Sequence, residues 1–444
     1  MRKKLKAGVA ITEISPEEGV ELAGYPHCPR YNTGVHDPLY ASCIYLDDSV
    51  TRLAIVAMDL LFYSKKYVKE MRRRISQKSG ISETNIMFCC SHTHSGPWAA
   101  GRLDLEALEN GLKLDMNYIN DLNNKLETMV LNACSNTFEA QIGVEKGYCG
   151  REQGVGGNRR NPEGPADPEV CVIGVQDIFG QWKGCLVCYA LHPTLIHSES
   201  TVVSADYPAY IRKYLMWAKP GMVSLFSQGT SGDQSSRYFR DGQNFEEASR
   251  IGTIIGVEVG KVLDGMKMLS NIDLIIKSME TDLELRVYPG RRTAEENVKK
   301  AGERLDSLRS SKASYIDIRN AELKLLGAED ILGYIILQEK GITPDLLVDE
   351  LPMEIQVIGI GEARVITIQG ELFVDIGLKI KNKSPFKRTF VIELANGAAP
   401  GYIYTKEAIT EGGYETDTSM LGDGCAEIIV SSALRLLNTT VEKK

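Results

Sequence analysis

The tripeptide His92-Thr93-His94 is the feature that most constrains this chain, because it follows directly on a short apolar run, Asn85–Ser91, that is typical of a buried strand. Side chains two residues apart on an extended backbone point to the same face. Both imidazoles can then reach one metal ion, or one can bind it while the other acts beside it. The alternative is a pair of structural histidines. Since the chain has only 6 histidines, their clustering at a strand end favours a metal site.

Two other apolar runs of the strand type also lead into a potential metal ligand. The run Lys183–Leu191 leads to His192, and the run Ala363–Ile368 is followed closely by Glu371. Two histidines and one glutamate are a common set of protein ligands in catalytic zinc sites, which keep one position open for water. Taken alone, such a histidine or glutamate is more often structural or solvated. Their shared placement after strands is what predicts a site.

These segments resemble the neutral (non-lysosomal) ceramidases, which are zinc amide hydrolases. The resemblance runs through most of the chain as scattered motifs. In chain order they are Ala7–Thr12, Gly34–Tyr40, His92–Pro97, His192-Pro193, Val203–Tyr207, Gly370-Glu371, Asn396-Gly397, Gly401-Tyr402 and Tyr414-Glu415. The spacing from Tyr402 to Tyr414 resembles that between the zinc-binding and the catalytic tyrosine of the family.

The resemblance implies specific roles for residues of this chain. It implies one zinc ion with four ligands, which are His92, His192, Glu371 and Tyr402. It also implies three side chains around the substrate carbonyl, which are His94, Arg159 and Tyr414. The family has an Asn-Arg pair where this chain has Asn158-Arg159-Arg160, so Arg160 is the alternative match. An exposed loop arginine is the structural alternative.

The implied chemistry is attack of zinc-activated water on an amide carbonyl. Tyr414 and Arg159 are suited to stabilise the oxyanion that forms, and His94 is suited to protonate the leaving amine. Asp59 ends an apolar run in the same way as the ligands, so it either orients a histidine or caps a turn. His36 is expected to be structural, with a place in the lining of the site as the alternative.

One segment departs from the family pattern. The family hexapeptide Gly-Asp-Val-Ser-Pro-Asn corresponds here to Gly232-Asp-Gln-Ser-Ser-Arg237, which keeps the glycine, the aspartate and Ser235. Because the serine of this hexapeptide is thought to be functional in the family, Ser235 is expected to lie in the substrate pocket.

The order of apolar runs and amphipathic segments predicts an α/β fold. Strand-like runs such as Arg52–Met58 alternate with helical segments such as Lys65–Lys78 and Leu114–Asn136, which indicates a mixed β-sheet core flanked by helices. Residues from about 291 to 345 are rich in Ala, Glu, Lys and Leu and predict a helical insertion. Because the ligands lie on both sides of it, residues 1–444 are expected to form a single catalytic domain, without the immunoglobulin-like domain of the ceramidases.

Composition restricts the partners and the cell compartment. A formal charge of −8 and the lack of long basic runs argue against nucleic acid or an anionic membrane as the main partner. No apolar segment approaches the length of about 20 residues that spans a membrane. Cys89 and Cys90 are adjacent on a strand and point to opposite faces, so they are not expected to pair. Buried reduced cysteines and the short N-terminal apolar stretch predict a cytoplasmic protein.

The sequence therefore predicts a zinc-dependent, ceramidase-like hydrolase that binds one zinc ion and cleaves the amide bond of a small-molecule N-acylated amine or lipid, such as a sphingolipid. Two alternatives remain. One is a zinc hydrolase of another small amide or ester, and the other is a binding protein that has lost catalysis.

Overall fold

The structure, a computed structural model, describes residues 4–25, 28–100, 114–343 and 345–441. The strands are β1 (Lys6–Glu13), β2 (Tyr40–Asp47), β3 (Arg52–Met58), β4 (Ile86–Cys90), β5 (Phe138–Tyr148), β6 (Gly157–Asn158), β7 (Glu169–Asp177), β8 (Trp182–Tyr189), β9 (Val223–Gln228), β10 (Gln234–Ser235), β11 (Leu274–Thr281), β12 (Met353–Ile360), β13 (Ala363–Ile368), β14 (Glu371–Leu372), β15 (Thr389–Ile392) and β16 (Tyr402–Ile403). The α-helices are α1 (Lys65–Ser79), α3 (Met116–Ser135), α4 (Tyr207–Ala218), α5 (Phe245–Gly265), α6 (Arg291–Ser310), α7 (Tyr315–Glu339), α8 (Asp345–Glu350), α9 (Val374–Lys383), α10 (Lys406–Glu411), α11 (Tyr414–Thr418) and α12 (Cys425–Asn438).

An eight-stranded mixed sheet forms the centre of the molecule, with the strand order β4-β3-β2-β1-β5-β7-β8-β9. Its two outermost pairs, β3 with β4 and β8 with β9, are parallel, and the pairs between them are antiparallel. Strands β3 and β4 are buried on both faces, which is why their sequences read as continuous apolar runs.

A second sheet of four strands, in the order β11-β12-β13-β15, packs against one face of the large sheet. Ile44 and Ile55 of the large sheet share a core with Ile358 and Phe390 of the small sheet. The sequence predicted a mixed-sheet core and did not indicate this second sheet. Strand sequences of this kind show that a strand is buried on both faces, but they do not specify whether a helix or another sheet covers it.

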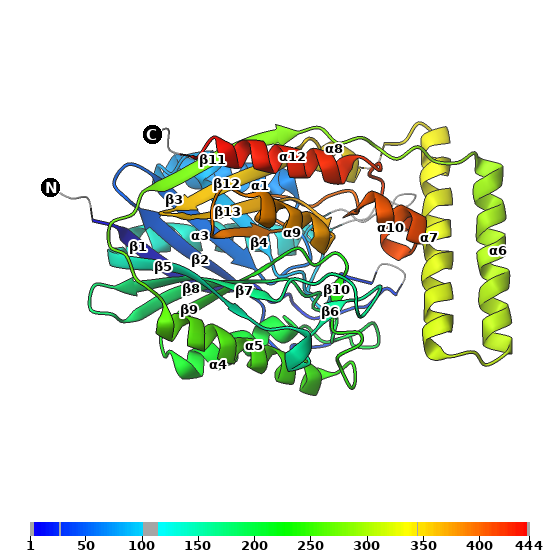
Figure 1. Cartoon of the computed structure of the whole chain (residues 1–444), viewed down its shortest axis with the longest axis horizontal. Coiled ribbons are helices and arrows are strands. Elements are labelled where there is room, and N and C mark those ends of the chain that lie inside the picture. Colours follow the sequence, from blue (N-terminus) through cyan, green and yellow to red (C-terminus); the bar gives the residue numbers. More distant parts are fainter. Residues whose placement is uncertain (1–3, 26–27, 101–113, 344, 442–444) are drawn as a thin grey trace.

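Helices cover the outer faces of both sheets, so the molecule has helix, sheet, sheet and helix layers (Figure 1). Helices α1 and α3 pack on one part of the large sheet, and α4 and α5 pack on another part. Helices α9 and α12 cover the small sheet. The predicted fold class, a mixed β-sheet core flanked by helices, is confirmed. Capping fixes the ends of α1, because the Ser64 side chain accepts from the Lys66 N–H and Gly80 adopts φ 72°.

Helices α6 and α7 form a hairpin that projects from one end of the molecule (Figure 1). Two ion pairs join them: Arg291–Glu339 at 3.0 Å and Arg309–Glu322 at 2.9 Å. Helix α7 also contacts α11, where Lys324 donates to Asp417 at 2.6 Å. The insertion therefore extends to the helix that carries Tyr414. The single catalytic domain predicted for residues 1–444 stays a prediction.

No helix in the described ranges has the length and apolar character needed to cross a membrane. All the cysteines, including the buried Cys89 and Cys90, are free thiols. The cytoplasmic location inferred from the sequence stays a prediction.

Candidate metal and catalytic site

Three buried donor atoms meet where the sequence predicted a metal site. The Nε2 atoms of His92 and His192 lie 3.1 Å apart, and each is 3.2 Å from Oε2 of Glu371. Both histidines are 1% exposed and Glu371 is 7% exposed, so bulk water does not separate these atoms. Residues from three distant parts of the chain therefore form one compact cluster.

Backbone carbonyls fix the tautomer of both histidines. The Nδ1 of His92 lies 3.2 Å from the carbonyl of Leu61, and the Nδ1 of His192 lies 2.7 Å from the carbonyl of Ser231. Since a carbonyl oxygen only accepts, each Nδ1 donates and each Nε2 carries a lone pair. Two lone pairs and a carboxylate oxygen thus face one another, an arrangement that a cation between them would stabilise.

The spacing of the three atoms fits a tetrahedral metal ion. Ligands at about 2.0 Å from a zinc ion lie about 3.3 Å from each other in a tetrahedron. The observed separations of 3.1 and 3.2 Å agree with this value. Burial, followed by the charge of Arg159, lowers the pKa of His192 to about 4. Neutral imidazoles and a carboxylate are the forms that bind metal.

His94 belongs to the same cluster. Its ring centroid lies 4.9 Å from that of His92, and ligand nitrogens of His92, His94 and His192 all lie within 4.8 Å of one another. Its Nδ1 donates to the carbonyl of Gly24 at 2.9 Å, whereas its buried Nε2 has no hydrogen-bond partner among the described residues. A Cβ at Gly24 would lie 2.5 Å from His94, so this position requires glycine. His94 Nε2 is free to bind a metal or to move a proton.

The backbone at the first histidine differs from the predicted extended strand. Strand β4 ends at Cys90, and His92 adopts φ 67° in the left-handed region. The two imidazoles therefore do not share a face through strand alternation, and this part of the prediction is wrong. The His92 N–H instead donates to the carbonyl of Leu60, in the segment after β3, at 2.9 Å. Strain at a non-glycine residue is typical of functional sites.

The segment after β8 is held by buried polar contacts. The Asp206 carboxylate accepts from the N–H groups of Leu195 and Ile196 at 2.8 and 2.9 Å. The hydroxyl of Tyr207 donates to the carbonyl of Leu191 at 2.7 Å. Asp206 and Tyr207 belong to the motif Val203–Tyr207 named in the sequence analysis. Their contacts fix the loop that carries His192.

Tyr402 is placed beside Glu371 by strand pairing. The short strands β14 and β16 run parallel, and Glu371 is the partner of Tyr402 in their register. The ring of Tyr402 stacks near that of His192, with centroids 6.5 Å apart. Burial, then Glu371, raises the pKa of its phenol, so Tyr402 stays protonated unless a cation lies near its oxygen.

Glu393 was not predicted from the sequence and supports two members of the cluster. It is fully buried and accepts from the backbone N–H of Ser231 at 3.0 Å and from that of Leu372 at 2.6 Å. Ser231 in turn accepts from His192, and Leu372 follows Glu371. The one sequence signal was an acidic residue directly after an apolar run, Thr389–Ile392.

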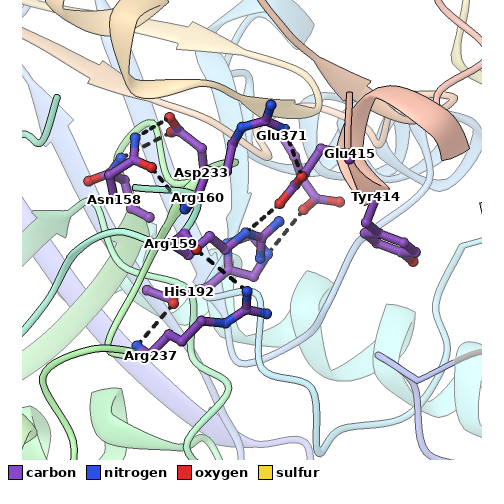
Figure 2. A network of polar contacts seen from close by, with 12 residues as sticks. Asn158, Arg159, Arg160, His192, Asp233, Arg237, Glu371, Tyr414 and Glu415 are labelled. Atoms are coloured by element: carbon purple, nitrogen blue, oxygen red, sulfur yellow. Dashed lines mark hydrogen bonds and ion pairs between the residues drawn. The ribbon is translucent and has the colours of Figure 1, made fainter. Parts of the chain in front are cut away.

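Arg159 and Arg160 share one carboxylate, that of Glu415 (Figure 2). Arg159 Nε donates to it at 2.8 Å and Arg160 Nη1 at 3.1 Å. Arg159 lies 5.5 Å from the ring centroid of Tyr402, and its buried Nη2 has no hydrogen-bond partner in the described ranges. Arg160 donates instead to the carbonyl of Gly412 at 2.7 Å. Arg159 is therefore the arginine that faces the cluster.

Ser235 and Tyr414 lie around the same space. Ser235 pairs with Gly157 between β10 and β6, a contact that also carries Arg159 to the site. It is 4% exposed, and its hydroxyl accepts from the N–H of Arg237 at 3.2 Å. Tyr414 begins α11, and its ring centroid lies 6.2 Å from that of Tyr402. The roles expected for these residues stay predictions.

Two residues considered in the sequence are engaged in other contacts. The Asp59 carboxylate accepts from Arg212 at 2.5 Å and from the N–H of Tyr40 at 2.9 Å, a structural role that differs from the turn cap given as the alternative. His36 bonds to Asp37 at 3.0 Å and stacks on Phe245 with a centroid distance of 3.5 Å. Both contacts are structural.

The cluster opens into a cavity of about 1180 Å³. The residues of the site that line it are His92, His94, Arg159, Ser235, Glu371, Tyr402 and Tyr414. Helix α7 supplies another part of the lining, including Arg319 and Leu323. Fold and site together define the class: a mixed α/β protein with a histidine and carboxylate cluster, suited to a metal, at a large cavity.

Comparisons with known proteins narrow this class. The chain is 22% identical over 244 residues to the neutral ceramidase of Pseudomonas aeruginosa and 24% identical over 249 residues to neutral ceramidase B of Dictyostelium discoideum. Each match covers 51% of this chain, and the chain spans about a third of the relatives' lengths, 36% and 34%. No protein-family model matches the chain.

The fold is that of solved ceramidase structures. The crystal structure of the Pseudomonas aeruginosa neutral ceramidase matches with a TM-score of 0.74 at 16% identity, covering 100% of this chain and 76% of that chain. A ceramidase complexed with C2 matches with a TM-score of 0.70 at 16% identity, covering 98% of this chain and 75% of that chain. The chain is related to the neutral ceramidases.

Proposed function

We propose that this chain is a zinc-dependent hydrolase that cleaves the amide bond of an N-acylated amine. The observation that carries the proposal is the set of three facing donors, Nε2 of His92, Nε2 of His192 and Oε2 of Glu371, at 3.1 to 3.2 Å from one another. The kinship with neutral ceramidases, named for an amide hydrolysis, supports the reaction class.

The ligand set we propose for the zinc ion is His92, His192 and Glu371, with Tyr402 as the fourth protein ligand. A zinc ion supplies a Lewis acid and lowers the pKa of water that it binds. Glu371 and Tyr402 face each other in the register of β14 and β16, so one short strand pair would hold two ligands.

The remaining roles fall to side chains around the cluster. We assign Arg159 Nη2 and the Tyr414 hydroxyl to the substrate carbonyl oxygen, where negative charge develops during attack. Arg159 Nη2 has no hydrogen-bond partner among the described residues, so it is available to such an oxygen. We assign His94 Nε2 to take up a proton and deliver it to the leaving nitrogen.

The test is a hydrolysis screen with zinc-loaded and chelator-treated protein. The substrates vary the acyl length and the amine, and include ceramide, N-acylethanolamines, N-acyl amino acids and simple esters. We expect amide hydrolysis that is lost with the metal and restored by zinc. His192→Ala, which removes one donor of the cluster, is the matched variant and should not be restored.

Other results would select an alternative. Hydrolysis of esters but no amides would indicate a zinc hydrolase of another substrate class. Tight binding of N-acyl amines to the zinc-loaded protein without turnover would indicate a binding protein, and zinc-independent hydrolysis would contradict the proposed metal chemistry.

A further inference from the structure

The cavity above the cluster is lined by many cationic side chains. These are Arg159, Arg160, Arg237, Arg240, Arg319 and Lys324. Glu415 pairs with the first two. Arg319 pairs with Glu322 at 3.0 Å, and Lys324 pairs with Asp417 at 2.6 Å. Arg240 donates to the carbonyl of Thr194 at 3.1 Å.

Arg237 differs from these in having no carboxylate within ion-pair distance in the part of the chain that the structure describes. Its guanidinium makes one long hydrogen bond, to the backbone carbonyl of Arg159 at 3.5 Å, beyond the usual range of about 2.7–3.2 Å. A guanidinium has five N–H donors, so most of them are available in the cavity. Arg237 is exposed, and it lines the cavity wall.

The charges around Arg237 favour a bound anion. Partial loss of hydration in the cavity, then the positive charges of Arg159 and Arg319, lowers the pKa of the exposed Arg237, and Glu415 opposes this effect. Glu415 is already shared between Arg159 and Arg160. An anion bound by Arg237 would relieve the repulsion among the guanidinium groups of Arg159, Arg237 and Arg319. It would also accept charge-assisted hydrogen bonds from Arg237.

Arg237 lines the same cavity as the metal cluster. The Arg237 guanidinium bonds to the backbone carbonyl of Arg159 (Figure 2). The Arg159 guanidinium lies 5.5 Å from the ring centroid of Tyr402. The backbone N–H of Arg237 donates to the hydroxyl of Ser235, which lines the same cavity. A group bound by Arg237 would thus lie on the cavity wall that Arg159 and Ser235 also line.

We propose that Arg237 binds an acidic group on the amine part of the substrate, so that the preferred substrates are N-acyl amines that carry a carboxylate or a sulfonate. This inference rests on the proposed amide hydrolysis and specifies its substrate class. An acidic amine part would distinguish this chain from an enzyme that acts on a neutral lipid amide.

The test compares substrates that share a lauroyl chain and differ in the amine: N-lauroylglycine, N-lauroyltaurine and the neutral N-lauroylethanolamine. The wild-type enzyme should have the highest kcat/KM on one of the two acidic substrates, which also identifies the acidic group. Arg237→Gln should lower that value by about 10- to 100-fold, the loss typical of a charge-assisted hydrogen bond, chiefly through KM. Arg237→Gln should leave kcat/KM for N-lauroylethanolamine unchanged.

Two control variants separate charge recognition from other effects. Arg237→Lys keeps the charge and should retain part of the preference. Arg292→Gln removes the same charge from α6, where the side chain is 92% exposed, and should change none of the three rates. A wild-type preference for the ethanolamide, or an equal loss on all substrates in Arg237→Gln, would overturn the proposal.

A binding measurement distinguishes failure of this inference from failure of the proposed function. Ketone analogues, in which a methylene replaces the amide N–H, are titrated calorimetrically into zinc-loaded protein. If the wild type hydrolyses no amide, the proposed function fails, but tighter binding of the keto acid than of the keto alcohol, lost in Arg237→Gln, still supports the role of Arg237. Equal binding of both analogues, or none, overturns it.

Discussion

Ser231 donates both its backbone N–H and its hydroxyl to the buried carboxylate of Glu393, at 3.0 and 2.5 Å. The carbonyl of the same serine accepts from His192 Nδ1 at 2.7 Å. Glu393 also accepts from the N–H of Leu372, the neighbour of Glu371. One carboxylate thereby fixes the loop behind one candidate ligand and the strand that carries another.

Glu393→Gln is expected to weaken metal binding without removing a ligand. The amide cannot accept all three hydrogen bonds, so His192 and Glu371 lose their fixed orientation. Loss of such an outer contact typically lowers metal affinity by about 10- to 100-fold. Zinc affinity is measured by competition with a chelator. The control is Glu354→Gln, which breaks a buried ion pair with Arg72 and should lower Tm but not zinc affinity. Equal loss of affinity in both variants would contradict the role of Glu393.

The metal cluster is expected to bind one zinc ion per chain. His92→Ala, His192→Ala and Glu371→Gln should each lose it, because each removes one of the three facing donors. Saturating zinc should raise the Tm of the wild type, since a ligand at 100 times its Kd stabilises by about 2.7 kcal/mol. Metal analysis and thermal unfolding check this. His36→Ala, whose ring stacks on Phe245, should keep the ion. Full zinc content in His192→Ala would show that the cluster is not the site.

His94→Ala is expected to retain most of the zinc and to lose most of the turnover. General acid catalysis typically contributes about 10²- to 10⁴-fold to the rate. The measurements are zinc content and kcat on the best substrate of the screen. His94 Nε2 is close enough to the other nitrogens to bind the same ion, so zinc loss parallel to that of His92→Ala would reassign it as a ligand.

The two tyrosines are expected to respond differently to loss of the hydroxyl. Tyr402→Phe should weaken zinc retention in the presence of a chelator, because the phenol is the proposed fourth ligand. Tyr414→Phe should keep zinc and KM and lower kcat by about 10²- to 10³-fold, as loss of one oxyanion donor does. Each variant is the control of the other. Equal zinc loss, or full activity in Tyr414→Phe, would show that the assignment is wrong.

Several strands could be predicted from the sequence with the bounds that the structure has. Arg52–Met58, Ile86–Cys90 and Ala363–Ile368 are such strands, because each is a short segment rich in apolar residues. The two helices of the insertion, α6 and α7, were expected as one helical segment. The second sheet was missed, since its pairing with the first depends on contacts between residues far apart in the chain.

The sequence by itself determined the fold class and named the residues that meet in the cluster. Apolar runs that form buried strands can be recognised from neighbouring residues alone, and the histidines and the glutamate follow such runs directly. Tertiary structure alone decided how they meet. The left-handed turn at His92, the pairing of Glu371 with Tyr402 and the contact of Glu393 with Ser231 depend on distant segments. Two-residue strands and single buried carboxylates carry no periodic signal, so the packing of the two sheets sets their positions.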